Sequence, residues 1–334
     1  MVERKRLSAK SGGVYFDNDP ALFFSSGCAL LDCVLGGGWA RRRTVNVVGD
    51  KSTGKTLLAI ESIPNFYAVC PDAEVTYAEC ESAFDPHYAK SLGVPLDKVR
   101  FPKFDTVEKL FKDLEELTKS KPKNHLYIVD SLDALSTETE MEREIDASTF
   151  GAEKARQLSQ LFRRITQPLE QCGVTLMIIS QVRDNIGVTF GKSDTRSGGR
   201  ALDFYCSQVL WLTHKKRIAS IKKGVERTVG VEVKAKCEKN KVGMPFRECQ
   251  FPIYFGYGVE DVEAGAQWLS TITGGLETLS DLNGDAKLAL ADFWKRADKM
   301  NDEEYKMLKG QVAERVKVVW EEIEERFKMP RKKY

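Results

Sequence analysis

Eight consecutive residues carry the strongest chemical signal in this sequence: they read Gly49-Asp50-Lys51-Ser52-Thr53-Gly54-Lys55-Thr56 and fit the pattern G-x-x-x-x-G-K-[ST]. Glycines at this spacing allow a loop whose backbone amides, together with the N-terminus of a following helix, form a concave anion site. The lysine then reaches the β- and γ-phosphates of a nucleotide, and the threonine hydroxyl coordinates Mg²⁺. We therefore expect the stretch from Gly49 to Leu57 to bind the phosphates of a nucleotide.

The residues on either side of this loop favour the same interpretation. Thr44-Val45-Asn46-Val47-Val48 is rich in β-branched residues and indicates a buried strand. Leu57-Leu58-Ala59-Ile60-Glu61-Ser62 is compatible with a helix. Strand, loop and helix thus come in the order that a phosphate-binding loop requires, whereas an accidental glycine-rich turn would need no such order.

Carboxylates follow two later apolar runs at the positions where a sheet would present them. Asp130 directly follows the run Leu126-Tyr127-Ile128-Val129. Its carboxylate is expected to help hold Mg²⁺ beside Thr56. Hydrolysis also needs a group that orients and deprotonates water, and Glu79 and Glu81 both follow a strand-like run. The residues alone do not separate these two, and either could be an exposed acid at a strand end.

The elements that must position these side chains can be predicted from the apolar pattern. Short apolar runs recur at 45–48, 75–78, 126–129, 174–179, 209–212, 229–233 and 246–251. The first four alternate with helix-like segments, which predicts βαβ units and a mostly parallel sheet, and the later runs suggest antiparallel additions. Ligands then bind at the carboxyl ends of the strands.

Beyond residue 262 the strand-like runs stop and the pattern becomes helical. The apolar residues at helical spacing are Tyr305, Leu308, Val312, Val316, Val319, Trp320, Ile323 and Phe327. We interpret this stripe as facing a core. The expected organisation is a flexible arm over 1–21, an α/β P-loop ATPase core over 22–262, and a small helical C-terminal domain over 263–334.

Composition narrows the possible partners and the compartment. The 334 residues include 51 basic and 49 acidic side chains, so a site for a polyanion must be local. Eight scattered cysteines without a CxxC pair are expected to be reduced thiols, and three histidines without ligand spacing receive no role. No run approaches 18 apolar residues, so we expect a soluble cytoplasmic protein without a membrane partner.

Five segments of the sequence, taken in their order along the chain, carry a resemblance to a known family. They cover 26–32, the phosphate loop, 81–94, 129–131 and 180–202. In this order they resemble the RecA-type DNA recombinases, and among them a bacteriophage-like relative, over about residues 23–260. The resemblance implies a RecA-like core whose cofactors are ATP and Mg²⁺.

The resemblance also implies roles in the ATPase site. By this resemblance Glu81 is the catalytic base, and Asp130 is the Walker B acid. Asp85 and Tyr88 fall where the family contacts adenine. Gln181 matches the glutamine that senses the γ-phosphate, and a neutral amide can donate to a phosphate oxygen and move when that oxygen leaves.

Two loops correspond to the family's contacts with single-stranded DNA, 140–147 and 183–200. Cations in them would neutralise phosphates, apolar residues would stack on or wedge between bases, and glycines would give mobility. The residues expected to contact DNA, with two arginines downstream of the first loop, are Arg143, Arg156, Arg163, Arg183, Ile186, Gly187, Val188, Phe190, Lys192, Arg196, Gly198, Gly199 and Arg200. For Arg156 and Arg163, solvated helix charges are an equal alternative.

Lys239 and Lys241 match the paired lysines that, in the family, reach the ATP of a neighbouring subunit. The resemblance thus implies an active site that is completed between protomers. Some features depart from the family. Asp203 stands in place of a lysine near the subunit interface, no N-terminal oligomerisation helix is evident, and the chain ends in basic rather than acidic residues.

The expected function is a DNA-dependent ATPase that forms helical filaments on single-stranded DNA and promotes pairing and strand exchange with homologous duplex DNA in recombination and repair. Mediator and single-strand-binding proteins are further expected partners. A ring-forming motor is one alternative, although an arginine finger would be expected there instead of the lysine pair. A filament-forming scaffold that binds ATP without turnover is another, and the intact set of catalytic residues argues against it.

Overall fold

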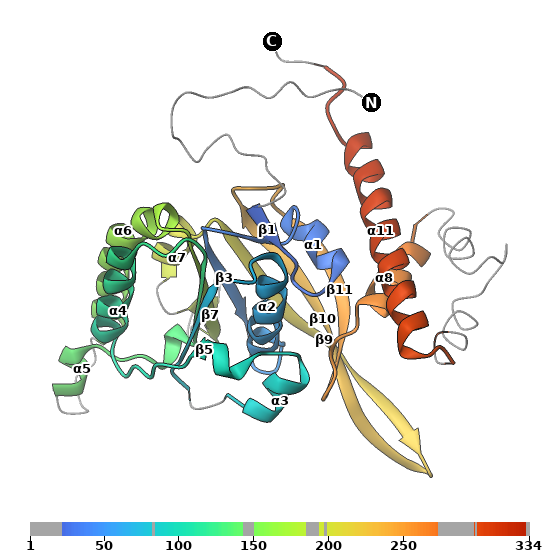
Figure 1. Ribbon diagram of the computed structural model, residues 1–334, viewed down its shortest axis with the longest axis horizontal. Coiled ribbons are helices and arrows are strands. Elements are labelled where there is room, and N and C mark those ends of the chain that lie inside the picture. The colour runs from blue at the N-terminus through green and yellow to red at the C-terminus, as the bar shows by residue number, and fades with distance from the viewer. Residues whose placement is uncertain are drawn as a thin grey trace.

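The computed structural model describes residues 22–81, 84–142, 150–184, 194–196, 199–272, 297 and 299–331. One large sheet dominates this part of the chain (Figure 1). Its strands, in spatial order, are β12 (Gly258–Val259), β11 (Arg247–Tyr254), β10 (Val225–Asn240), β9 (Gln208–Lys222), β3 (Thr44–Gly49), β7 (Val174–Asp184), β6 (His125–Asp130), β4 (Glu74–Glu79) and β5 (Val99–Arg100). A short strand, β8 (Asp194–Arg196), pairs with β7.

The direction of the strands follows the sequence pattern. From β9 through β3, β7, β6 and β4 to β5, neighbouring strands run parallel. β9, β10, β11 and β12 pair antiparallel with one another. This confirms the predicted mostly parallel α/β sheet with antiparallel additions at one side.

Helices cover both faces of the sheet because its central strands are apolar on both faces. Val45 and Val47 of β3 belong to one buried cluster, whereas Val48 belongs to the other. The first face is covered by α1 (Ala29–Leu35), α2 (Lys55–Val69), α8 (Asp261–Ser270) and α11 (Asp302–Arg326), and the second by α4 (Val107–Ser120), α6 (Phe150–Gln171) and α7 (Gly199–Tyr205). Strands buried on both faces read as continuous apolar runs.

Shorter elements complete the described chain. They are β1 (Phe23–Phe24) paired with β2 (Trp39–Ala40), α3 (Pro86–Ser91), the 3₁₀ turns Leu96–Lys98 and Leu132–Ala134, and α5 (Glu138–Glu142). None of the described helices combines the length and the apolar character needed to cross a membrane. All eight cysteines are free thiols.

The C-terminal helices share the core of the first face. α11 buries Leu308, Val312 and Val316 in the cluster that also holds residues of α1 and α2. The expected boundary at residue 262 falls inside α8, and a Cβ at Gly265 of that helix would lie 2.5 Å from Cγ1 of Val312. The expected arm over 1–21 and much of the interval from 273 to 298 lie outside the described residues.

The hairpin of β9 and β10 is longer than the sequence indicated. It projects from the body of the molecule, as the yellow and orange ribbons of Figure 1 show. Its turn places Lys223 and Gly224 at φ of 51° and 77°, and two successive positive φ angles are typical of the tight turn that matches strand twist. From Thr213 onward β9 is largely exposed, so its outer half has no apolar face from which a strand could be predicted.

Candidate nucleotide-binding site

The phosphate-binding loop lies at the carboxyl end of β3. The strand ends at Gly49 and α2 begins at Lys55, so strand, loop and helix follow in the predicted order. Glycine is favoured at two positions of this loop. A Cβ at Gly49 would lie 2.6 Å from Oγ1 of Thr53 and 2.9 Å from the backbone oxygen of Leu212. Gly54 has a φ of 85°, a left-handed conformation that favours glycine, and a Cβ there would push against Cδ1 of Ile253 at 2.4 Å.

Inside the loop, polar groups converge on the carbonyl oxygen of Asp50. Nζ of Lys55 donates to this oxygen at 2.7 Å, and Oγ1 of Thr53 donates to it at 2.8 Å. Burial lowers the pKa of Lys55, while the nearby carboxylates of Asp130 and Glu81 oppose that shift. A partly desolvated ammonium beside backbone amides at a helix N-terminus fits the phosphates of a nucleoside triphosphate.

Asp130 and Thr56 contact each other across the end of β6 and the start of α2. The hydroxyl of Thr56 donates to the carboxylate of Asp130, and the hydroxyl of Tyr77 donates to its Oδ2 at 2.6 Å. Burial raises the pKa of Asp130, and these two hydrogen bonds counteract part of that rise. A hydroxyl and a carboxylate side by side are hard oxygen ligands, so the pair fits the predicted Mg²⁺ site.

Three strands bring together Glu81, Gln181 and Ser131. Nε2 of Gln181 donates to Oε1 of Glu81 at 2.6 Å, and Oγ of Ser131 donates to the same oxygen. The backbone N–H of Gln181 donates to Oδ2 of Asp133 at 2.7 Å, which fixes the glutamine at its position in β7. The structure thus joins Glu81 and Gln181, which lie 100 residues apart in the chain.

Glu79 has different partners from Glu81. Its Oε2 lies 3.8 Å from Nζ of Lys103, and its Oε1 accepts a hydrogen bond from the N–H of Phe84 at 3.4 Å. Glu79 is buried, whereas Glu81 is exposed. Glu81 accepts a hydrogen bond from the glutamine of β7, and this contact favours Glu81 over Glu79 as the hydrolytic carboxylate.

Sequence reasoning missed three side chains of this site. They are Ser131, Asp133 and Tyr77, which position Glu81, Gln181 and Asp130 respectively. Ser131 and Asp133 directly follow the carboxyl end of β6, a position that could have suggested a role. Tyr77 lies inside a buried strand, where its hydroxyl needs a partner, but nothing in the sequence identifies that partner.

Asp85 and Tyr88, expected beside adenine, lie at the start of α3. The carboxylate of Asp85 caps this helix, because its Oδ1 accepts from the N–H of His87 at 2.8 Å and of Tyr88 at 3.2 Å. Tyr88 is half-buried against the core of the first face, and burial raises the pKa of its hydroxyl. The contact of both residues with adenine stays a prediction.

Lys239 and Lys241 lie towards the amino end of β3, away from the carboxyl end that carries the phosphate loop. Nζ of Lys239 donates to the carbonyl oxygens of Asp203 and, at 2.9 Å, of Phe204 at the end of α7. Burial lowers the pKa of Lys239, and the charge of Lys241 lowers it further.

The strand register separates these lysines from the phosphate loop of their own chain. Lys239 is opposite Val209 in β9, whose neighbour in β3 is Asn46. The phosphate loop follows Gly49, at the carboxyl end of that strand. A protomer thus holds its lysine pair towards the amino end of β3 and its phosphate loop at the carboxyl end.

The two loops expected to contact DNA are described only in part. Arg183 lies in β7, two residues after Gln181, and pairs in register with Thr195 next to Arg196 of β8. Gly199 and Arg200 begin α7, and Arg156 and Arg163 lie exposed on α6. The other expected contacts lie outside the described residues, namely Arg143, Ile186, Gly187, Val188, Phe190, Lys192 and Gly198.

Comparison with known proteins agrees with this arrangement. The family model described as the RecA N-terminal domain matches residues 17–260. Protein RecA of Synechococcus sp. (strain CC9902) is 37% identical over 238 residues, which cover 71% of this chain and 61% of that protein. Protein RecA of Streptomyces coelicolor is 38% identical over 243 residues, which cover 72% of this chain and 63% of that protein. The match thus spans somewhat over three fifths of the length of these curated relatives. The chain belongs to the RecA family.

Proposed function

We propose that this protein is a DNA-dependent ATPase that assembles into helical filaments on single-stranded DNA and promotes homologous pairing and strand exchange. The observation that carries the proposal is the position of Gln181. Its side chain holds Glu81, and two residues later the same strand reaches Arg183, the first residue of the second expected DNA loop. One strand therefore connects the hydrolytic carboxylate to a candidate DNA contact.

The site residues divide the work of hydrolysis. The amides of the phosphate loop and the ammonium of Lys55 bind and orient the phosphates of ATP. Glu81 orients a water molecule and accepts its proton, while Ser131 and Gln181 hold the carboxylate through Oε1. Mg²⁺, held with Thr56 and Asp130, would supply positive charge to the β- and γ-phosphates.

Gln181 is the group that couples nucleotide to DNA. Its amide donates either to Glu81, as in this structure, or to a γ-phosphate oxygen, and the exchange moves the end of β7. A shift of β7 displaces Arg183 and the loop that follows it. ATP thereby favours the arrangement that holds DNA, and hydrolysis removes that preference.

Lys239 and Lys241 explain why ATP hydrolysis would depend on assembly of the protomers into a filament. Because they lie away from their own phosphate loop, they complete the site of a neighbouring protomer in a head-to-tail arrangement. There they stabilise charge that grows on the phosphates in the transition state. Hydrolysis then requires a filament.

The finer expectations belong to the same proposal. Adenine lies against Tyr88 and Asp85, homologous duplex DNA is the second DNA substrate, and mediator and single-strand-binding proteins are further partners. The protein acts in the cytoplasm of a bacterium or of a phage-infected bacterial cell.

Phosphate release with and without single-stranded DNA tests the proposal. We expect strong stimulation by DNA in the wild type and a loss of about 10²–10⁴-fold in Glu81→Gln, because the amide cannot accept the proton of water. Glu79→Gln is the matched control and should keep most of the stimulated rate, since Glu79 contacts Lys103 and Phe84. A wild type indifferent to DNA, or a Glu81→Gln variant with the wild-type rate, would contradict it. Electron microscopy with DNA separates filaments from the rings of a motor.

A further inference from the structure

Lys154 lies in the first half of α6 and reaches across to the 3₁₀ turn Leu132–Ala134, which follows β6. Its Nζ donates to the carbonyl oxygen of Asp133 at 3.1 Å and also to that of Leu135. The last carbonyl groups of so short a turn have no acceptor role within the turn itself, so they need donors from elsewhere. An ammonium has three donors, and Lys154 therefore fixes the turn to α6.

The turn that Lys154 holds also positions the ATPase site. The carboxylate of Asp133 accepts from the backbone N–H of Gln181 at 2.7 Å. Ser131, directly before the turn, donates through Oγ to Oε1 of Glu81. Nε2 of Gln181 donates to the same carboxylate oxygen at 2.6 Å. A displacement of this turn would thus move both the hydrolytic carboxylate and the glutamine that contacts it.

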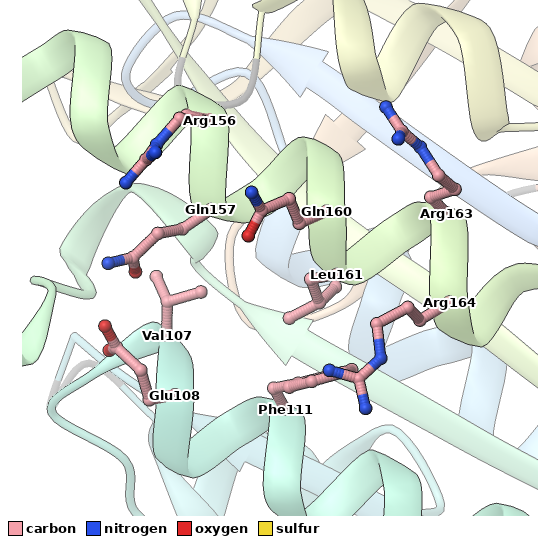
Figure 2. A pocket seen from close by; sticks show the side chains of 9 residues that line it. All are labelled: Val107, Glu108, Phe111, Arg156, Gln157, Gln160, Leu161, Arg163 and Arg164. Carbon is pink, nitrogen blue, oxygen red and sulfur yellow. The ribbon is translucent and has the colours of Figure 1, made fainter.

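Lys154 is directed inwards, unlike the arginine two residues after it on α6. Arg156 is exposed and, with Gln157, lines a pocket of about 500 Å³ between α4 and α6 (Figure 2). Lys154 is half-buried and is not part of that lining. Burial raises the pKa of the Cys80 thiol, next to Glu81, to about 12, and the charge of Lys154 counteracts part of that rise. The ammonium therefore acts on the end of β4 as well as on the turn.

The first expected DNA loop, 140–147, lies between the two ends of this connection. Lys154 follows the loop, whereas Leu135, whose carbonyl it holds, precedes Lys154 by 19 residues and comes before the loop. Between Leu135 and the loop, Thr137 and Glu140 form a reciprocal pair of hydrogen bonds that starts α5, with lengths of 2.8 and 3.1 Å. A displacement of the loop therefore reaches the turn along the chain on one side and through the lysine on the other.

Packing makes α6 a rigid lever between the loop and the turn. Leu158 and Phe162 are buried in the core of the second face. Phe162 also stacks on Tyr205 of α7, with ring centroids 6.4 Å apart. Because a close-packed helix moves as a unit, a shift at its start changes the distances between Nζ of Lys154 and the two carbonyl oxygens.

We propose that Lys154 is a positioning residue that couples the first DNA loop to ATP hydrolysis. When single-stranded DNA binds this loop and displaces the start of α6, the ammonium moves the 3₁₀ turn with it. Asp133 and Ser131 then shift the glutamine and the carboxylate that they hold. This connection is separate from the one through β7 and Arg183. The inference rests on the proposed function and adds a residue to it.

The decisive variant is Lys154→Met, which removes the ammonium and keeps most of the side-chain length. ATP hydrolysis is measured with Mg²⁺, without DNA and with saturating single-stranded DNA. We expect the ratio of the stimulated to the unstimulated rate to fall about ten-fold, a typical size for the coupling of two sites. The loss should appear in kcat rather than in KM for ATP, because the phosphate loop is untouched. Lys112→Met, at an exposed position of α4, is the matched control and should leave the ratio unchanged.

Two outcomes of this measurement would overturn the role of Lys154. One is a Lys154→Met variant that DNA stimulates as strongly as the wild type. The other is an equal loss of both rates, which would make Lys154 a support of the site without a part in the response to DNA. A wild type that DNA does not stimulate would instead refute the proposed function, and the coupling with it.

Hydrogen–deuterium exchange of the backbone amides of residues 131–136 checks the movement of the turn independently. In the presence of a slowly hydrolysed ATP analogue, single-stranded DNA should change this exchange in the wild type and change it much less in Lys154→Met. Protection of the second loop, 183–200, should appear in both proteins and report that the variant is folded and binds DNA. A response of residues 131–136 that is absent from the wild type, or equal in both proteins, would overturn the proposal.

Discussion

Glu61 is a buried acid on the helix that follows the phosphate loop. Its Oε1 accepts a hydrogen bond from the N–H of Val259 at 3.0 Å, and its Oε2 is buried without a partner among the described residues. Burial raises the pKa of Glu61 to about 7, and the charge of Lys309 counteracts part of that rise. The folded protein thus binds a proton on this side chain more tightly than the unfolded chain does.

This pKa predicts how stability depends on pH. Because the folded value lies above the ordinary value of 4.5, the contribution of Glu61 is most favourable at low pH and is lost as the pH rises to about 7. Glu61→Gln removes the buried charge, so it should raise the free energy of unfolding by roughly 1–3 kcal/mol at pH 8 and by much less near pH 5. Urea denaturation at both pH values measures this, and a variant less stable than the wild type at pH 8 would refute it.

Gly54 and Gly224 have similar backbone angles and different surroundings. Both have a positive φ, 85° and 77°, but a Cβ at Gly54 would meet Cδ1 of Ile253, and one at Gly224 would meet nothing within 4 Å. Gly224→Ala should therefore cost about 1 kcal/mol of stability, the cost of the left-handed conformation alone. Gly54→Ala should cost more and also weaken binding of ATP. Thermal unfolding and calorimetric titration compare them, and equal effects of the two variants would count against the packing of the loop.

For single residues, the sequence predicted the phosphate-binding loop but not the contacts that distinguish Glu79 from Glu81. The pattern of glycines and Lys55 is local, so it is visible in one short segment. The difference between Glu79 and Glu81 depends on Gln181 and Lys103, which other elements bring to the site. Such contacts follow from tertiary packing, and the strand-end position of both acids did not reveal them.

Among the elements, α11 has the clearest energetic role. Val316 is fully buried in the cluster it shares with α1 and α2, whereas Val318 on the same helix is 38% exposed. Val316→Ala should lower the free energy of unfolding by about 2 kcal/mol, since it removes two methyl groups and leaves a cavity. Val318→Ala should change it by less than about 0.5 kcal/mol. If chemical denaturation gave the same value for both, α11 would not belong to this core.

Elements were predictable where burial imposed a period. The central strands and α11 show the apolar repeat of buried elements, and both were predicted from it. The outer half of the β9–β10 hairpin was missed because its side chains face solvent on both sides. The C-terminal boundary at 262 cut α8, because a helix that joins two parts of one core has no composition change at its start.

For the whole molecule, the sheet determines which residues can share a site. Parallel strands bring Gly49, Glu79, Asp130 and Gln181 to one edge, where Gly49 is beside Gln181 and Glu79 is beside Asp130. β10 runs antiparallel to β9, and its end places Lys239 towards the amino end of β3. The resemblance implied that this lysine serves a neighbour, and the register supplies a physical reason for that hypothesis.

A mixed filament tests the shared active site most directly. Glu81→Gln and Lys239→Ala are each expected to lose phosphate release stimulated by single-stranded DNA. In an equimolar mixture, about a quarter of the head-to-tail interfaces join an intact Glu81 to an intact Lys239, so the stimulated rate should recover to about a quarter of the wild-type rate. A mixture as inactive as its two components would contradict the account, because each lysine would then serve only its own protomer.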